Sequence, residues 1–358
     1  MSQDLRPPKR RRDGDEGSEA SQDPLDGLKR SEEFWIPDGN IVLIAGKTAF
    51  RVYRGLLTLQ STVFSDLFAS SSPRAEESHD GCPVILLTDS AQDLTHLLRV
   101  LLPSSRTFYH RGKDDPDVSF HEVSAVIRLT HKYHIEGLLR QALSSLQEIF
   151  TTSFKIWEDD SRRHPISIEH DSAYIAVVGL ARLTDTPSLL PLALYKCCSL
   201  RGAIVDGWER EDGTVEYLPP EDLKRCINAR DSFAKEAFSL VSAIFDPAPS
   251  KRCKTFSTCK RVLRKVFREI LDHKEVAEPG VLNPWNVFIR DCASLEDEDR
   301  CCSLCEGKLL ERDTRERERI WNRLPEIFDI EVPNWNQDPD TKDDGDGHDD
   351  ANSNDAGN

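Results

Sequence analysis

The sequence predicts an α+β protein in which a small sheet covered by helices precedes a mainly α-helical region. Three observations lead to this class. Short apolar or alternating runs typical of strands occur in the first 150 residues and nearly vanish after residue 151. Apolar residues at helical spacing dominate the rest of the chain up to residue 333. Both ends of the chain are polar and have no periodicity, so the folded part lies between them.

The two ends of the chain are predicted to be disordered. Residues 1–31 carry seven basic and seven acidic side chains and no apolar stripe. Residues 334–358 form an acidic tail, in which the stretch from residue 336 onward has eight Asp and one Lys. Like charges repel one another and nothing apolar is available for burial, so we expect this tail to be solvated.

Composition limits the possible functions. The chain has 358 residues, 38% of them apolar, which suffices for two domains. The net charge of −16 argues against a nucleic-acid-binding surface as the main function, because phosphate binding needs excess Lys and Arg. No apolar run is long enough to predict a membrane span, and the polar start lacks the apolar segment of a secretory signal. We therefore expect an intracellular protein whose ten cysteines stay reduced.

The first strands of the predicted sheet lie in residues 40–52, NIVLIAGKTAFRV, which read as two strands joined at Gly46-Lys47-Thr48. The stretch 50–68 then passes from strand alternation to helical spacing with no Gly-Pro punctuation. Residues 84–88, VILLT, predict a third strand. Because this run is apolar, we expect it to be buried on both faces.

Helices follow these strands. Ser90 and Asp93 form a capping box at the start of the first one, and Ser119 and Glu122 start the second. A third apolar stripe occupies residues 138–149. The order strand, strand, helix, strand, helix, helix, helix predicts a small sheet flanked by helices.

The second region, residues 151–333, is predicted to be a helical domain. Its clearest helix, 219–245, has Pro and acidic residues in the first turn and apolar residues at helical spacing behind them. Further apolar helices are expected at 171–183, 187–200 and 259–274.

Three blocks of the first region resemble the BTB/POZ domain. Residues 40–68 follow the order of the family's hairpin, the strand that ends in valine-histidine-lysine, and the helix after it. Tyr53 stands in the histidine position and Arg54 in the basic one. VILLTDSAQDLTHLLRVLLP resembles the family's next strand, acidic turn and helix, and VIRLTHKYHIEGLLRQALSSL resembles its helix pair. The resemblance covers residues 32–150 and implies a BTB/POZ domain there.

Two further motifs resemble a large fungal, basidiomycete-type group of BTB proteins. They are FWIPDGNIVL near the start of the first region and IWNRLPEIFDI at residues 320–330. In that group a helical region of unknown role follows the domain, and a pair of cysteines often precedes the closing motif. This wider resemblance covers nearly the whole chain.

The resemblance implies a protein-binding function. BTB domains use the hairpin and the following helix to self-associate or to hold another protein. A short sheet with helices on it also leaves apolar surface for a partner. The candidate interaction residues on these elements are Asn40, Tyr53, Arg54, Leu57, Phe64 and Phe68.

Two departures from the family bear on the kind of partner. In some relatives the arginine equivalent to Arg54 faces an aspartate, whose place is taken here by Asn40, with Asp38 two residues earlier. An exposed Arg54 without a special role is the alternative. Relatives that dock on cullin scaffolds carry an apolar residue two before a glutamate, where this chain has Ala75 before Glu77. A substrate adaptor of a cullin-based ubiquitin ligase is therefore one alternative function, and a flexible polar loop is the other explanation of this stretch.

Two basic segments raise a nuclear alternative. The cluster PPKRRR is of the kind that an import receptor reads, although the DGDE that follows offsets its charge. Its basic residues are Lys9, Arg10, Arg11 and Arg12. The helix 259–274 has a basic face that could contact nucleic acid, an acidic partner or the chain's own acidic tail, and a solvated face is the usual explanation. A nuclear transcription-associated regulator is thus a second alternative, and the cluster favours the nucleus over the cytoplasm.

The cysteines predict a structural zinc site. Cys302 and Cys305 have the two-residue spacing that lets both thiolates hold one tetrahedral zinc ion. Cys253 and Cys259 are the first choice for the second pair, with Cys292 as a substitute. Such a site would tie the terminal helix to the helix 259–274. A set of reduced, buried thiols is the alternative.

The motifs of common enzymes are missing from the sequence. It has no HExxH run, no phosphate-binding GxxxxGK[ST] or GxGxxG run, and no nucleophile elbow. We therefore expect a non-enzymatic interaction protein, a scaffold or adaptor, whose partners are other proteins or a second copy of itself.

Overall fold

The computed structural model shows a mixed chain of strands and helices, with helix in the majority. The residues that it describes are 25–70, 78–102, 117–159, 161, 166–271, 280–293 and 300–337. They form two compact units that divide between Leu101 and Leu102. The main sheet belongs to the first unit and the long helices to the second, in the order that the sequence predicts.

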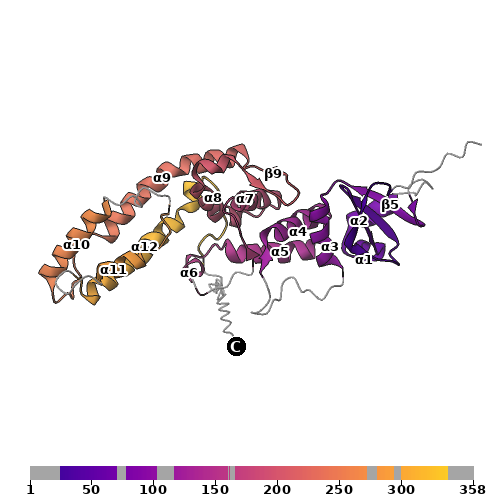
Figure 1. Ribbon diagram of the computed structural model, residues 1–358. Helices are drawn as coiled ribbons and strands as arrows, with labels where there is room; N and C mark the ends of the chain where they lie inside the picture. Colours follow the sequence, from indigo (N-terminus) through magenta and orange to yellow (C-terminus); the bar gives the residue numbers. More distant parts are fainter. Residues whose placement is uncertain are drawn as a thin grey trace, which may run out of the picture. The chain divides into compact units, whose positions relative to one another are not determined.

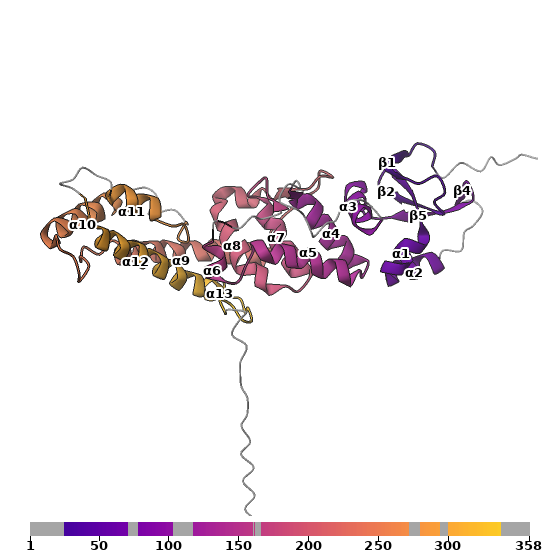
Figure 2. The same ribbon diagram turned by 90° about the horizontal axis from the view of Figure 1, so that it is seen from below.

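The first unit contains a five-stranded sheet in the order β1-β3-β2-β5-β4 (Figure 2). The strands are β1 (Lys29–Trp35), β2 (Ile41–Ala45), β3 (Thr48–Val52), β4 (Ser78–His79) and β5 (Cys82–Leu87). β2 and β3 form the predicted hairpin, an antiparallel pair that places Ile41 opposite Val52 and Ala45 opposite Thr48. Gly46 has a φ of +56° in the tight turn, which a side chain would disfavour. β1 pairs with β3 and β5 pairs with β2, both in parallel.

The prediction that residues 84–88 are buried on both faces is wrong. In β5, Ile85 and Leu87 are buried but Leu86 is 74% exposed. All five residues of β2 are buried instead, because β2 lies at the centre of the sheet. An apolar run shows that a strand has no polar face, but it does not show that other elements cover both faces.

The folded part of the first unit begins earlier than residue 32. β1 starts at Lys29, which lies opposite Thr48 of β3. Leu25 is buried in a cluster with Val42, Ile44 and other core residues. Isolated apolar residues in a polar stretch produce no periodic signal, so this segment could not be recognised from sequence as part of the sheet edge.

A serine makes the abrupt junction between two helices in the stretch 50–68. Helices α1 (Arg54–Gln60) and α2 (Thr62–Ser70) are separated by Ser61 alone. The backbone N–H of Ser61 donates to Leu57 at the end of α1, and its hydroxyl accepts from the N–H of Phe64 at 3.0 Å. One residue thus satisfies backbone groups on both sides of the break, so no Gly or Pro is needed.

The last helix of the first unit, α3 (Ala91–Leu101), begins at the predicted capping box. The hydroxyl of Ser90 accepts a hydrogen bond from the N–H of Asp93 at 3.0 Å. Leu94, Leu97 and Leu98 of this helix are fully buried. The capping box therefore starts the helix in the phase that buries its leucines.

The second unit is built mainly of helices (Figure 1). The longer ones are α4 (Phe120–Lys132), α5 (Glu136–Ile149), α7 (Ala173–Leu183), α8 (Leu190–Ser199), α9 (Pro220–Ile244), α10 (Phe256–Leu271), α11 (Asn286–Ala293) and α12 (Ser303–Asn322). Short elements join them: β6 (Val118–Ser119), α6 (Phe154–Trp157), β7 (Ile166–Ser167), η2 (Pro187–Leu189), η3 (Arg201–Val205), β8 (Trp208–Glu209), β9 (Val215–Glu216) and α13 (Leu324–Ile327). The sequence predicted helices in the places of α7, α8, α9 and α10.

Helices α4 and α5 belong to this second unit. They pack against each other, and α4 also packs against α7. Arg128 of α4 forms an ion pair of 2.5 Å with Glu216 of β9. The compact units therefore divide near residue 101, whereas the sequence placed a domain boundary near residue 150. The assignment of 32–150 to one domain stays a prediction.

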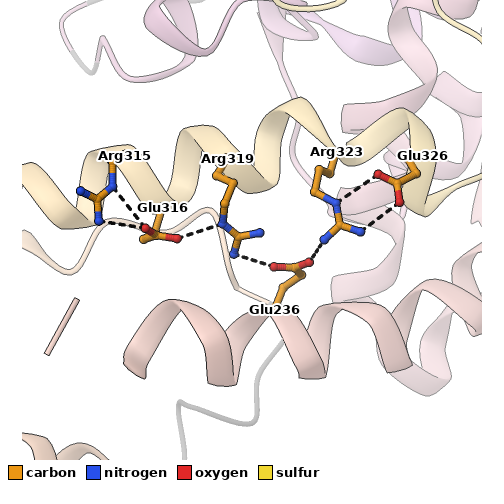
Figure 3. A network of polar contacts seen from close by, with 6 residues as sticks. All are labelled: Glu236, Arg315, Glu316, Arg319, Arg323 and Glu326. Carbon is orange, nitrogen blue, oxygen red and sulfur yellow. Dashed lines mark hydrogen bonds and ion pairs between the residues drawn. The ribbon is translucent and has the colours of Figure 1, made fainter. Parts of the chain in front are cut away.

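Helices α9 and α12 run side by side, and ion pairs join them (Figures 1 and 3). Glu236 of α9 accepts hydrogen bonds from Arg319 and Arg323 of α12, the first at 2.7 Å. Glu316 and Glu326 hold the same two arginines from within the C-terminal segment. Because Glu236 is only 8% exposed, its charge depends on these arginines for compensation.

Arg312 makes a second connection between α9 and α12. Its guanidinium donates to the carbonyl oxygens of Ile244 and Asp246 at the end of α9, at 3.1 and 2.9 Å. It also pairs with the Asp246 carboxylate at 3.0 Å. A cation at a helix C-terminus satisfies carbonyls that have no partner in the helix and interacts favourably with the helix dipole.

We predict that Glu236→Ala lowers the free energy of unfolding by about 1–2 kcal/mol, because two half-exposed arginines lose a buried partner. Glu326→Ala is the matched control, since Glu326 is exposed and pairs with only one of the arginines. Its substitution is expected to cost clearly less, because solvent and salt screen an exposed ion pair. Urea unfolding of both variants measures the difference, and equal costs would contradict a role for Glu236 in joining the helices.

Candidate metal centre

Four cysteines from two distant parts of the chain come together in the second unit. Cys253 lies shortly before α10 and Cys259 in its first turn, while Cys302 immediately precedes α12 and Cys305 lies in its first turn. Their four Sγ atoms all lie within 4.8 Å of one another. These are the four residues that the sequence selected for a metal site.

The spacing of the sulfur atoms suits a shared cation rather than a disulfide. The Sγ atoms of Cys253 and Cys302 are 3.7 Å apart. Four sulfur ligands at about 2.3 Å from a tetrahedral zinc ion lie ~3.8 Å from one another, whereas a disulfide bond measures about 2.05 Å. All cysteines with described side chains are free. The donor set consists of four thiols, which is the chemistry of a structural zinc site.

Backbone and hydroxyl groups surround the sulfur atoms with hydrogen bonds. The N–H of Cys302 donates to Cys259 Sγ at 3.4 Å, and the N–H of Ser250 donates to Cys305 Sγ at 3.3 Å. The hydroxyl of Thr255 lies 3.2 Å from Cys259 Sγ. Donors of this kind stabilise thiolates and orient metal ligands. Cys302 and Cys305 also lie at the N-terminus of α12, where the helix dipole favours negative charge.

Cys259 and Cys305 differ in how readily their thiols ionise. Burial opposes ionisation of Cys259, but the N–H of Cys302 and the Thr255 hydroxyl outweigh it and lower the pKa of this thiol to about 7. Burial raises the pKa of Cys305, and the N–H of Ser250 opposes this only in part. One thiolate is therefore accessible near neutral pH, and a cation would be needed to hold several of them together.

Two other cysteines lie near the cluster in the sequence. Cys292, the substitute ligand, has no described side chain. Cys301 is next to Cys302 and buried, and it is not a member of the cluster. The sequence distinguishes these residues only weakly, because it is the turn before α12 that directs Cys302 toward Cys259.

The predicted interaction residues of the first unit divide into two groups. Leu57, Phe64 and Phe68 are buried, with exposed fractions of 0–4%. They form the core of the first unit. They can therefore support an interaction surface from below but cannot contact a partner directly. Phe64 and Phe68 stack with their ring centroids 5.5 Å apart.

Asn40, Tyr53 and Arg54 lie at the surface and bond to near neighbours. Asn40 Oδ1 accepts from the N–H of Arg54 at 2.8 Å. The hydroxyl of Tyr53 donates to Asp38 at 2.6 Å, and this hydrogen bond raises the pKa of Tyr53. The guanidinium of Arg54 donates to the carbonyl oxygen of Phe68 and lies over its ring. Asp38 thus pairs with Tyr53, and Arg54 packs against Phe68.

Several predicted features fall outside the described residues. They are the basic cluster Lys9, Arg10, Arg11 and Arg12, the Ala75–Glu77 stretch and the acidic tail from residue 338.

The sequence did not single out two exposed leucines of the first unit. Leu59 on α1 is 79% exposed and Leu86 on β5 is 74% exposed. Leu59 lies outside the apolar stripe of its helix, and this position could have been used to predict its exposure. For Leu86, the apolar run concealed that one face is open.

A cavity of about 500 Å³ in the second unit is lined by apolar and neutral polar residues together with four carboxylates and the buried Arg317. Arg317 pairs with Asp313 at 2.9 Å and also with Glu158. The N–H of Trp285 donates to Asp313 at 3.3 Å. Burial raises the pKa of Asp313, and Arg317 opposes this shift. These buried charges satisfy one another and connect α12 to the loops around it.

Comparison with known proteins adds no relative: no model of a known protein family matches the chain, and no curated protein matches it either. Among the described helices, none has the length and apolar character needed to cross a bilayer.

We predict that Leu57→Ala lowers the free energy of unfolding by about 2–5 kcal/mol, because it leaves a cavity in the core of the first unit. Leu59→Ala, two residues away on the same helix, is expected to cost less than about 0.5 kcal/mol, because its side chain is exposed. Thermal and urea unfolding measure both values. A large cost for Leu59→Ala alone would contradict the orientation of α1.

Proposed function

We propose that this protein is a non-enzymatic protein-binding protein that acts through a BTB/POZ domain. The observation that supports this best is the agreement of the element order with the family pattern. The hairpin β2–β3 leads into the helix pair α1–α2, then to β5, α3 and the helix pair α4–α5. The direct passage from strand to helix at Tyr53 belongs to the same pattern.

The exposed leucines support an interaction surface on this part of the chain. Leu59 and Leu86 are large apolar side chains that stand almost fully in solvent. Covering each of them with a partner would release about 1.5–3 kcal/mol of hydrophobic free energy. We propose first that the partner is a second copy of this chain. A different protein is the second candidate.

We predict that the full chain forms a dimer in light scattering over a concentration series. Leu59→Asp combined with Leu86→Asp should weaken the dimer by about tenfold or more, because a charge replaces an anchor in a desolvated surface. Val205→Asp is the control, since Val205 is also exposed but lies in the second unit. A mass of one chain at every concentration contradicts self-association. A wild-type dimer unaffected by the double substitution contradicts the assigned surface.

We also propose that the second unit binds one zinc ion, and that the role of this ion is structural. Cys253, Cys259, Cys302 and Cys305 would supply four thiolate ligands, and zinc would neutralise their charge and clip the start of α10 to the start of α12. The mutual proximity of the four Sγ atoms, within 4.8 Å, carries this proposal. The cullin-adaptor and nuclear functions stay predictions from the sequence.

We predict about one zinc ion per chain in metal analysis of the purified protein. Cobalt substitution should give the visible absorption of a tetrahedral thiolate site. Cys302→Ser should remove most of the metal and increase amide exchange at the start of α10 and of α12. Cys198→Ser is the control, because Cys198 is buried in α8 and outside the cluster. Wild-type protein with no zinc above the buffer blank, even after refolding with zinc, contradicts the site.

A further inference from the structure

One face of α10 is a concentrated band of positive charge. Its exposed residues at helical spacing are Arg261, Arg264, Lys265 and Arg268. The opposite face is apolar and buried, and consists of Val262, Leu263, Val266 and Ile270. The buried face sets the rotation of the helix, so the four cations are held together on the outside whether or not a metal ion is bound.

A groove of about 740 Å³ runs along this charged face. Lys260 and Phe256 also line it, with Lys260 Nζ 5.8 Å from the centroid of the Phe256 ring. Among the described residues that line it, Glu269 is the one carboxylate. The charges from Arg261 to Arg268 extend over about 10 Å of helix, which suits an extended polyanion better than a single small anion.

We propose that this groove binds the chain's own acidic tail, residues 338–358. Between residues 250 and 268 the sequence has eight Lys and Arg and no Asp or Glu. The tail has eight Asp and one Lys. The two segments are thus complementary in the sign and number of their charges.

The tail is long enough to reach the groove. It leaves the described part of the chain at Gln337, next to Asn336, whose side chain donates to Asn322 at the end of α12. The other end of α12 begins at Cys302, whose N–H meets Cys259 of α10. The 20 residues of α12 span about 30 Å, and thirteen extended tail residues span about 43 Å. Asp349, Asp350 and Asp355 can therefore reach the first turns of the basic face.

Because the tail is part of the same chain as the groove, ion pairs that are weak individually can together hold the tail there. A single exposed ion pair contributes about 0–1 kcal/mol, and salt screens it. A tethered segment, however, is present at an effective concentration in the millimolar range. The tail would then cover the basic face at low salt, leave it at high salt, and compete with any other polyanion, including nucleic acid.

The test uses a fluorescent synthetic peptide of residues 338–358 and the full-length, metal-loaded chain. The wild-type chain is compared with a tail-neutral chain, in which all eight tail Asp are changed to Asn. We expect the tail-neutral chain to bind the peptide at least about tenfold more tightly than the wild type, because its groove is not occupied in cis. This binding should weaken as salt is added.

Two variants of the tail-neutral chain locate the site. The first carries Arg261→Gln, Arg264→Gln, Lys265→Gln and Arg268→Gln. The second removes four exposed cations elsewhere by Lys47→Gln, Lys132→Gln, Arg140→Gln and Lys235→Gln. We expect the first variant to lose peptide affinity by about tenfold or more and the second to lose less than about twofold. Circular dichroism shows that both variants are folded.

Three results would overturn the proposal. The first is equal peptide affinity for the wild-type and tail-neutral chains. The second is equal loss of affinity in the two four-site variants. The third is a wild-type chain that binds duplex DNA as tightly as the tail-neutral chain does, because the tail would then not cover the face. Neutralising the acidic run from Glu296 to Asp299 is a further control, and it should leave the peptide affinity of the wild type unchanged.

Discussion

The pairing of α9 with α12 is the interaction on which the helical unit depends. α12 carries three buried charged residues, Arg312, Asp313 and Arg317. A buried charge without a partner costs several kcal/mol, so each of these residues restricts where the helix can lie. Arg312 must reach the end of α9, and Arg317 must reach both Asp313 and Glu158. Together with Glu236, these pairs allow one alignment of the two helices.

That alignment positions both ends of α12. Its first turn brings Cys302 and Cys305 to the start of α10. At its last turn, Trp321 is buried, donates from its ring nitrogen to the carbonyl oxygen of Thr152 and stacks on Trp335 with ring centroids 5.1 Å apart. The closing motif of the chain thus anchors the C-terminal segment, and the cysteine cluster anchors the opposite end of the helix.

The two units combine surfaces of different chemistry. The first unit exposes two large apolar side chains, Leu59 and Leu86, which a partner would cover in the proposed function. The second unit presents a cationic groove on α10, the proposed site of the acidic tail. Salt would have little effect on the proposed apolar contact and would weaken the proposed tail contact. A protein with both surfaces can keep one association while ionic conditions or a competing polyanion change the other.

Local patterns in the sequence predicted much of the fold. The hairpin in 40–52, the capping box at Ser90 and Asp93, and α9 follow from alternation, capping and helical spacing. The edge strand β1 was missed because its sequence, KRSEEFW, is mostly polar and has apolar residues only at Phe34 and Trp35. Leu86 was misplaced because an apolar run does not reveal which face of a strand is covered. Glu236 gave no signal, since its arginine partners lie more than 80 residues away.

The sequence alone therefore determined the order of the hairpin, β5 and the main helices, the segregation of charge into a basic helix and an acidic tail, and the Cys-x-x-Cys pair at 302 and 305. These features depend on residues that are close in the chain. The sequence also named Cys253 and Cys259 as the first choice for the second pair, and the tertiary structure brings them to Cys302 and Cys305. Only the tertiary structure decided that Leu57 is core while Leu59 is surface, and that buried arginines align α12 with α9. Each of these depends on distances between segments far apart in sequence, which are set by packing and by the need to pair buried charges.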